Sequence, residues 1–163
     1  MSSGFHSPQP AAAAAGTEEA VIDRFSGDFG FLSNFYESSL WYRGKQYGSV
    51  EHAYQACKAP DEASHETIRN ARTPSVAKRL GKAVRLPADW EARKLGLMRE
   101  LVHEKFKNPL LRALLLATED VPLVEGNTWN DTYWGVCRGA GLNWLGKILM
   151  EERELCKKEE APV

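Results

Sequence analysis

Two residue pairs with proline constrain the fold of this chain more than any other feature. Thr73 is followed by Pro74, and Asn108 is followed by Pro109. Threonine and asparagine cap helix N-termini through their side-chain oxygens, and proline suits the first helical position, where its missing N–H is not needed. The two pairs therefore predict helices that begin at residues 74 and 109.

Further capping residues extend this helical pattern along most of the chain. Ser49, Asp61 and Asp89 each precede a stretch of good helix formers, and Gly81 is placed to end the helix that Pro74 begins. The expected helices cover residues 49–58, 61–69, 74–81, 89–106, 110–117 and 143–155.

Short extended segments are expected in some of the stretches between helices. Residues 25–35 mix aromatic residues with glycine, are too rich in glycine for a helix, and predict a short strand and a structured loop. Residues 40–47 have the pattern of a small hairpin, and residues 121–124 that of a short extended piece. The expected fold class is mainly α, a single helical domain with a few short β-strands near the N-terminus.

Length and composition fit one domain with a polar segment at each end. The chain has 163 residues and a net charge of −1, so its bulk charge gives no reason to expect non-specific binding of nucleic acid. Residues 1–20 are rich in Ser, Pro and Ala and predict a disordered tail, residues 21–156 form the expected domain, and residues 157–163 a polar C-terminal tail.

Neither a membrane span nor a metal site is expected from the sequence. No apolar run approaches the ~20 residues of a membrane span. Cys57, Cys137 and Cys156 show no CxxC spacing, and the histidines form no HxxxH or HExxH pair. We expect reduced thiols, a cytoplasmic location and no cofactor.

A polar stripe runs along residues 49–58. Glu51, Gln55 and Lys58 follow one another at spacings of four and three, which places them on one side of a helix. A carboxylate, an amide and an amine aligned on a mostly apolar helix suit the wall of a pocket. The alternative is an ordinary amphipathic helix on which Glu51 and Lys58 are exposed charges.

A second group of candidates surrounds Asp131. Trp129, Tyr133 and Trp134 place aromatic faces next to its carboxylate, an arrangement that suits binding of a base or a sugar ring. The alternative is that both tryptophans belong to the core.

Two arginines are candidates for binding an anion. Arg138 begins a glycine-rich stretch, residues 138–141, ahead of the last expected helix, where backbone N–H groups can approach an oxyanion. Arg72 precedes the helix that begins at Pro74. For Arg72 the alternative is a solvated side chain.

Four segments, in order along the chain, resemble the YbiA-like or NADAR family. They are GFLSNF at residues 30–35, SVEHAYQACK at 49–58, ARTP at 71–74 with AK at 77–78, and WG at 134–135 followed by GLNWLG at 141–146 and LM at 149–150. The resemblance extends from about residue 25 to residue 153. One departure is Ala53, which stands where this family often has a bulky aromatic residue.

The resemblance implies a mainly helical fold and N-glycosidase activity. Two substrate classes are implied, the phosphoribosyl-aminopyrimidine intermediates early in riboflavin synthesis and ADP-ribose linked to guanine, free or in nucleic acid. Both have a ribose joined through nitrogen to a heterocycle, with phosphate on the 5′ side. The alternative from a different class is a non-catalytic module that binds ADP-ribose or NAD.

Breaking a ribosyl C–N bond develops positive charge on the sugar, and a carboxylate stabilises that charge or activates water. Glu51 and Asp131 are the two candidates for this role. Lys58 admits a second chemistry, a Schiff base with the ring-opened C1′, which requires a neutral amine. The presence of all three residues favours an enzyme over a binding module.

The remaining candidates are expected to bind the substrate. We expect Trp134 to stack on the heterocycle or adenine, Asn34 and Asn143 to hydrogen-bond the sugar or base edge, and Lys78 and the two arginines to contact phosphate. The expected binding residues are Asn34, Phe35, Gln55, Arg72, Lys78, Trp129, Trp134, Gly135, Arg138 and Asn143.

Overall fold

The structure of the protein is a computed structural model that describes residues 18–162, so nearly all of the tail expected at residues 1–20 lies outside the described residues. The predicted mainly helical fold class is confirmed. The described elements are η1 (a 3₁₀ helix, Gly27–Leu32), β1 (Leu40–Tyr42), β2 (Lys45–Tyr47), α1 (Val50–Ala56), α2 (Glu62–Arg69), α3 (Pro74–Ala83), α4 (Trp90–Lys105), α5 (Pro109–Leu116), β3 (Gly126–Asn127), β4 (Val136–Cys137) and α6 (Trp144–Glu160).

Capping side chains begin most of the predicted helices. Thr73 and Asn108 accept hydrogen bonds from backbone N–H groups in the first turns of α3 and α5, each followed by its proline at the start of the helix. Ser49 and Asp61 cap α1 and α2 in the same way. Asp89 also precedes α4, but its side chain makes no capping hydrogen bond.

The prediction of a strand within residues 25–35 is wrong. Gly27–Leu32 is a short 3₁₀ helix that buries Phe31 and Leu32. Gly27 adopts a positive φ of 58°, which glycine reaches without steric strain, and this lets the chain turn into the helix. A 3₁₀ turn needs few residues, so the glycines that exclude a long helix do not exclude it.

Two expected helix boundaries also differ. Gly81 lies inside α3, which continues to Ala83, and does not end it. The glycine is explained by packing instead, because a Cβ there would overlap the side chain of Gln55 in α1. The last helix, α6, continues to Glu160, so the first residues of the expected tail at 157–163 are helical. Lys157 supports this extension through ion pairs with Asp120 at 2.6 Å and Glu154 at 2.8 Å.

The strands form two small pairs. β1 and β2 make the predicted hairpin, with Leu40 opposite Tyr47. β3 and β4 pair in parallel, with Gly126 opposite Val136, at positions where the sequence predicts no strands. The extended piece predicted at residues 121–124 is present as a bridge between Leu123 and the N-terminal segment.

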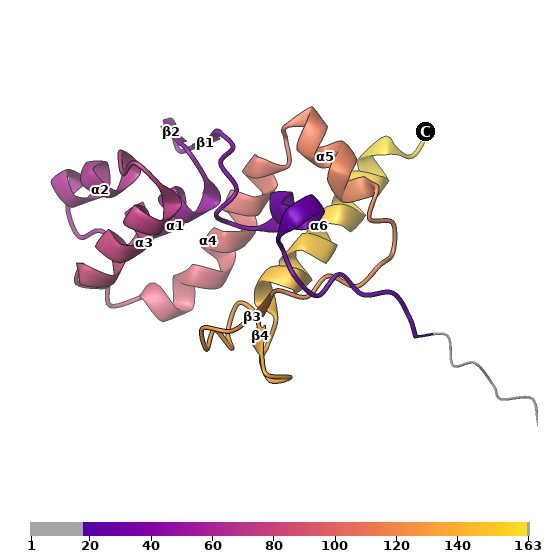
Figure 1. Ribbon diagram of the computed structural model, residues 1–163. Coiled ribbons are helices and arrows are strands. Elements are labelled where there is room, and N and C mark those ends of the chain that lie inside the picture. The colour runs from indigo at the N-terminus through magenta and orange to yellow at the C-terminus, as the bar shows by residue number, and fades with distance from the viewer. Residues whose placement is uncertain (1–17, 163) are drawn as a thin grey trace, which may run out of the picture.

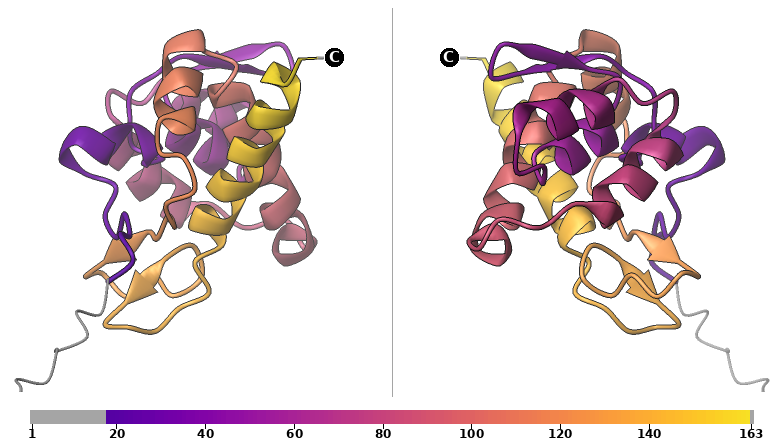
Figure 2. Two further views of the ribbon diagram at one scale, coloured as in Figure 1. Left: turned by 90° about the vertical axis from the view of Figure 1, so that its right-hand side faces the viewer. Right: turned by 90° about the vertical axis from the view of Figure 1, so that its left-hand side faces the viewer.

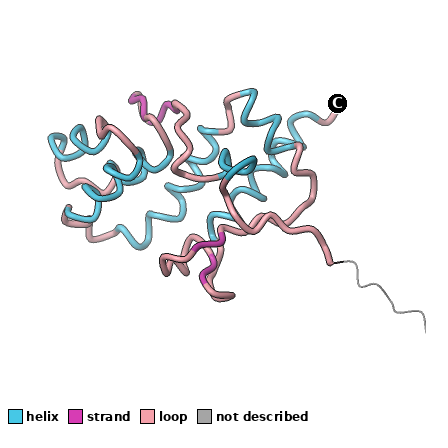
Figure 3. Tube along the Cα trace, viewed as in Figure 1, coloured by secondary structure: helices cyan, strands magenta, loops and turns pink. Residues whose placement is uncertain are grey.

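The helices form two groups on either side of α4 (Figure 1). The helices α1, α2 and α3 pack on one another, α5 packs on α6, and α4 contacts both α1 and α6. The pair β3 and β4 projects from the helical body in both views of Figure 2. Figure 3 shows that the connection between α5 and α6 is almost entirely loop apart from these two strands.

The core joins these groups. Fully buried side chains come from η1 (Leu32), α4 (Leu101, Phe106 at its end) and α6 (Ile148, Leu149). Burial of each such side chain contributes about 1.5–3 kcal/mol to folding. This core anchors α6, and with it the long loop that begins after α5.

Candidate functional site

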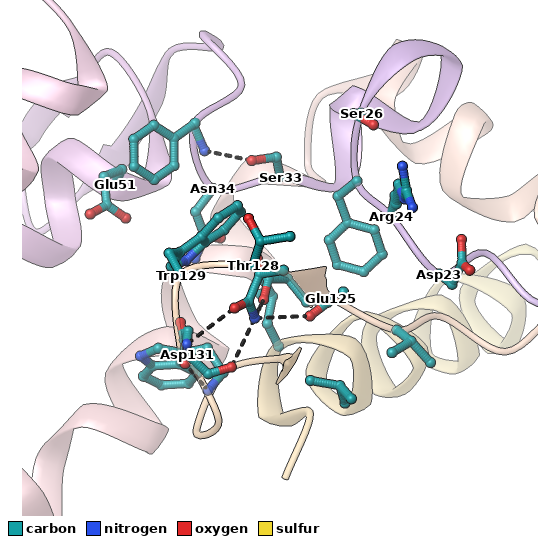
Figure 4. Close-up of a pocket in the computed structure, with 18 of the residues that line it drawn as sticks. Asp23, Arg24, Ser26, Ser33, Asn34, Glu51, Glu125, Thr128, Trp129 and Asp131 are labelled. Carbon is teal, nitrogen blue, oxygen red and sulfur yellow. Dashed lines mark hydrogen bonds between the residues drawn. The ribbon is translucent and has the colours of Figure 1, made fainter. Parts of the chain in front are cut away.

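A cavity of about 960 Å³ lies between the helical body and the loop that carries β3 and β4. Its wall combines the N-terminal segment and residues 33–35 with α1, α3 and residues 124–139. Figure 4 shows Glu51 and Arg24 on opposite sides, with Glu125 and Asp131 between them. The lining residues with polar or aromatic chemistry include Arg24, Asn34, Phe35, Glu51, Lys78, Glu125, Trp129, Asp131, Trp134 and Arg138.

Glu51 lies in the first turn of α1 and is 5% exposed. Its Oε1 accepts a 2.7 Å hydrogen bond from Gln55 Nε2, one turn later, as the predicted stripe requires. Its backbone N–H donates to the carbonyl of Asn34 at 3.0 Å. Burial raises the pKa of Glu51, and the Gln55 hydrogen bond and nearby lysines oppose that shift because they favour the carboxylate.

Gln55 acts behind Glu51 rather than on the cavity surface. It is buried and absent from the cavity lining. A Cβ at Gly81 would overlap its side chain, so α3 lies very close to α1 at this point. Gln55 therefore holds the carboxylate of Glu51 in one orientation.

Lys58 lies in the turn after α1, which ends at Ala56, and not on the helix as predicted. Its Nζ lies 5.0 Å from the ring centroid of Tyr54 and 5.7 Å from that of Trp90. Burial lowers the pKa of Lys58, while the charge of Glu51 opposes that shift. The lysine is close enough to Glu51 for their charges to interact, but it does not line the cavity.

The cation of Lys78 lies between two aromatic side chains. From α3, its Nζ is 5.5 Å from the ring centroid of Phe35 and 5.9 Å from that of Trp129. Trp129 is 59% exposed, so it belongs to the rim of the site and not to the core. This arrangement leaves a positive charge flanked by ring faces that a heterocycle can contact.

Asp131 lines the cavity from the loop between β3 and β4. Its Oδ1 accepts hydrogen bonds from the backbone N–H groups of Tyr133 at 3.1 Å and Trp134 at 2.9 Å. Asn127 holds the Asp131 backbone from both sides, through its Oδ1 at 3.1 Å and its Nδ2 at 2.8 Å. The bonds from Tyr133 and Trp134 occupy Oδ1 of the carboxylate, so Oδ2 is the oxygen available to contact a substrate or a water molecule.

Trp134 faces both the cavity and the core, the two positions between which the sequence did not decide. It lines the cavity and also packs against the core. Its ring makes edge contacts with Tyr54 of α1, at 5.6 Å between centroids, and with Tyr133, at 4.7 Å. The tryptophan thus joins the helical wall to the loop wall.

Four of the expected binding residues do not line the cavity: Gln55, described above, and Arg72, Gly135 and Asn143. Arg72 is exposed and lies outside the lining. The amide of Asn143 is engaged by the backbone, because Oδ1 accepts from Glu125 N–H at 2.9 Å and Nδ2 donates to the Leu123 carbonyl at 2.9 Å. Gly135 leaves space for Glu125, because a Cβ at this position would overlap the Glu125 carboxyl.

Glu125 is the residue that sequence reasoning missed. It directly follows the short extended piece at residues 121–124, and its side chain lines the cavity. Burial raises its pKa to about 7, and the neighbouring Asp131 adds to this shift. A lone glutamate after an extended segment gives no signal by itself. Arg24 was missed for the same reason.

The described part of the chain contains neither a candidate metal-binding group nor a candidate membrane-spanning helix. Among residues 18–162, no group of three or more His, Cys, Asp or Glu side chains is arranged to hold a metal ion. Within the same residues, no helix is both long enough and apolar enough to span a bilayer.

Comparisons with known proteins identify relatives over most of the chain. Residues 23–156 match the family model described as the NADAR domain. The chain is 44% identical over 143 residues to the N-glycosidase YbiA of Escherichia coli strain K12. The aligned region covers 84% of this chain and 89% of that protein. An N-glycosidase of Nostoc punctiforme is 40% identical over 133 residues, covering 77% of this chain and 85% of that protein.

Other comparisons extend to a riboflavin protein and to a solved structure. A riboflavin biosynthesis protein of Vibrio vulnificus is 39% identical over 137 residues, 82% of this chain but 37% of that protein. The NMR structure of E. coli YbiA matches with a TM-score of 0.77 and 38% identity, covering 89% of this chain and 91% of that chain. On this agreement of family model, sequence and fold, the chain belongs to the NADAR domain family.

Proposed function

We propose that this N-glycosyl hydrolase cleaves the ribosyl C–N bond of phosphorylated ribosylamino-heterocycles. The observation that carries the proposal is the grouping of carboxylates, aromatic rings and cations on one cavity. The carboxyl groups are those of Glu51, Glu125 and Asp131. Relatives named as N-glycosidases support the reaction class.

The carboxylate of Glu51 is suited to the developing positive charge at C1′. It is buried, and charge interactions of a buried group are stronger than in water. Gln55 restricts its orientation, so no side-chain freedom is lost when the substrate binds. Asp131, with Oδ2 free of the loop bonds, is the second candidate to stabilise C1′ or to activate water.

The aromatic and cationic residues suit the two ends of such a substrate. Phe35, Trp129 and Trp134 offer ring faces or edges to a heterocycle. Lys78 and Arg138 line the cavity and are suited to the 5′ phosphate, and Arg24 adds a third cation. Arg72 is a weaker candidate because it lies outside the lining.

Two substrate classes remain, each with its own support. The relative named as a riboflavin biosynthesis protein supports phosphoribosyl-aminopyrimidines. The cavity volume, about 960 Å³, supports the larger ADP-ribose linked to guanine, since it is near the upper end of the ~300–1,000 Å³ usual for small-molecule sites. The free thiols of Cys57, Cys137 and Cys156 fit a reducing compartment such as the cytoplasm.

A Schiff-base route through Lys58 is the alternative mechanism. Burial lowers the pKa of Lys58, which favours the neutral amine that this route needs. Its position in the turn behind Tyr54 opposes the route, because the lysine does not line the cavity. Borohydride added during turnover, followed by mass spectrometry, distinguishes the two routes. A stable adduct at Lys58 would establish the imine.

The proposed function is tested by incubating the purified protein with a phosphoribosyl-aminopyrimidine and, separately, with ADP-ribosylated guanosine. Release of the free heterocycle is followed by chromatography. Glu51→Gln protein is the control for a contaminating hydrolase. Tight binding of ADP-ribose in calorimetry, without release of either heterocycle, would instead support a binding module.

A further inference from the structure

Three residues define the surroundings of the Glu125 carboxyl group, which Asn127 bonds directly. Its Oε2 accepts a 3.2 Å hydrogen bond from Asn127 Nδ2, and the same nitrogen donates to the Asp131 carbonyl at 2.8 Å. Asn143 fixes the Glu125 backbone N–H at 2.9 Å. The missing Cβ of Gly135 leaves the space that Oε2 occupies. Residues from several parts of the loop wall thus hold one carboxyl group in the cavity (Figure 4).

Glu51, on the helical wall, has neighbours that favour its negative charge, although burial is the largest influence on it and raises its pKa. The amide of Gln55 donates to its carboxylate at 2.7 Å. Lys78, which lines the cavity, and Lys58, which does not, add positive charge that acts on Glu51. The neighbours that act on Glu51 therefore oppose the effect of burial and stabilise its ionised form.

Glu125 has surroundings that favour its protonated form. Burial is the largest cause of its raised pKa, and the hydrogen bond from Asn127 opposes it. Of the charged groups that act on it, Asp131 disfavours a second negative charge nearby, and Lys78 acts in the opposite sense. Two carboxyl groups in unlike surroundings suit one as an acid and the other as a carboxylate.

We infer that Glu125 is the acid that protonates the leaving nitrogen as the ribosyl C–N bond breaks, an inference that rests on the proposed function. Its carboxyl group lines the same cavity as Glu51 and is held in place before the substrate arrives. A positioned acid of this kind contributes about 10²–10⁴ in rate.

The proton and electron balance of the step is complete without a co-reactant other than water. When the C1′–N bond breaks, its electron pair goes to the nitrogen, which takes the Glu125 proton and departs as the free amino-heterocycle. The carboxylate of Glu51 faces the positive charge at C1′. Water then adds to C1′ and gives a proton to Glu51, and exchange with solvent returns the proton to Glu125.

The test compares two leaving groups in Glu125→Gln, a change that keeps the size of the side chain and removes the acid. One substrate is the phosphoribosyl-aminopyrimidine, whose nitrogen leaves only with a proton. The other is 4-nitrophenyl ribofuranoside 5-phosphate, whose nitrophenolate leaves without one. Glu125→Gln is expected to slow the first at least ~10²-fold and the second far less. Glu51→Gln is the matched control and slows both.

Equal losses on both substrates, or no loss on either, would overturn this role for Glu125. Wild-type protein that cleaves neither substrate rejects the proposed function itself, and the role of Glu125 with it. The melting temperature reports whether Glu125→Gln folds.

The wild-type pH profile provides a second test that needs no variant. Hydrolysis of the aminopyrimidine should fall above about pH 7, where Glu125 ionises, while hydrolysis of the nitrophenyl substrate should not. The same alkaline fall for both substrates would contradict the assignment.

Discussion

The two walls of the cavity position their carboxyl groups in different ways. On the helical wall, Glu51 is oriented by Gln55, its neighbour one turn along α1. On the loop wall, Asn127 of β3 bonds the Glu125 carboxyl and the Asp131 backbone, and Asn143, which directly precedes α6, bonds the Glu125 N–H. The first arrangement is local and repeats with the helix. The second depends on a loop whose ends are held by distant parts of the fold.

This difference predicts how each wall responds to change. A helix retains its geometry when one side chain is altered, because its backbone hydrogen bonds are internal. The backbone hydrogen bonds of the loop wall do not repeat regularly, and the amides of Asn127 and Asn143 satisfy further backbone groups there. Substitutions on the helical wall should therefore affect chemistry alone, whereas those on the loop wall should affect chemistry and stability together.

Glu51→Gln should have the largest effect on activity. The change removes charge but not volume, so we expect at least a ~10²-fold loss in turnover with little change in melting temperature. Steady-state rates and thermal unfolding measure the two quantities. If the folded variant retains wild-type turnover, Glu51 is not the carboxylate that faces C1′.

Trp134→Ala should weaken both walls, because the ring joins Tyr54 of the helical wall to Tyr133 of the loop wall. We expect a loss of about 3 kcal/mol in the free energy of unfolding, at the lower end for a buried aromatic residue, together with weaker substrate binding. Trp129→Ala is the matched control on the exposed rim, where binding should weaken and stability should not change. Denaturant unfolding that shows equal stability for the two variants would contradict the joining role.

A pair of glycine substitutions compares the walls directly. In Gly135→Ala the new Cβ would overlap the Glu125 carboxyl and also its backbone carbonyl, which cannot rotate away. We expect a loss of about 1–3 kcal/mol in stability and a fall in turnover.

In Gly81→Ala the new Cβ would overlap the Gln55 side chain of α1. Residue 81 lies inside α3, where alanine gains about 1 kcal/mol in helix propensity over glycine and so offsets part of the loss. The stability of Gly81→Ala should fall less than that of Gly135→Ala, as measured by urea unfolding. The reverse order would mean that the loop wall is the more adaptable of the two.

Lys105, which lies outside the cavity lining, provides a test of stability against pH. It is buried in α4, its Nζ donates to the Ser33 carbonyl at 2.8 Å, and burial lowers its pKa to about 7. The folded protein then binds fewer protons than the unfolded chain between about pH 7 and the ordinary lysine pKa of 10.5, so stability should rise with pH across this window.

Lys105→Met removes this dependence. The difference in unfolding free energy between wild type and variant should change by up to about 1.4 kcal/mol per pH unit within the window, and level off below pH 7. Unfolding at a series of pH values measures the slope. Parallel stability curves for the two proteins would show that the amine titrates normally.

Sequence patterns anticipated the helical wall well and the loop wall poorly. The Thr73 and Asn108 caps, and the spacing from Glu51 to Gln55, depend on interactions within one or two turns, so they are visible along the chain. Lys58 was misplaced on α1 because the sequence does not show that the helix ends at Ala56. Asn143 was assigned to the ligand because an amide in a motif looks the same whether it binds a substrate or a backbone.

The amino-acid sequence by itself determined a mainly helical domain, the family, and a carboxylate and an amide on one helix face. These properties depend on local spacing and on segments that keep their order along the chain. Tertiary structure alone decided that Glu125 lines the cavity, that Gly135 makes space for it, and that Arg72 lies outside the lining. The reason is physical: burial, a shared amide and the overlap of a missing Cβ arise only when residues far apart in sequence are brought together.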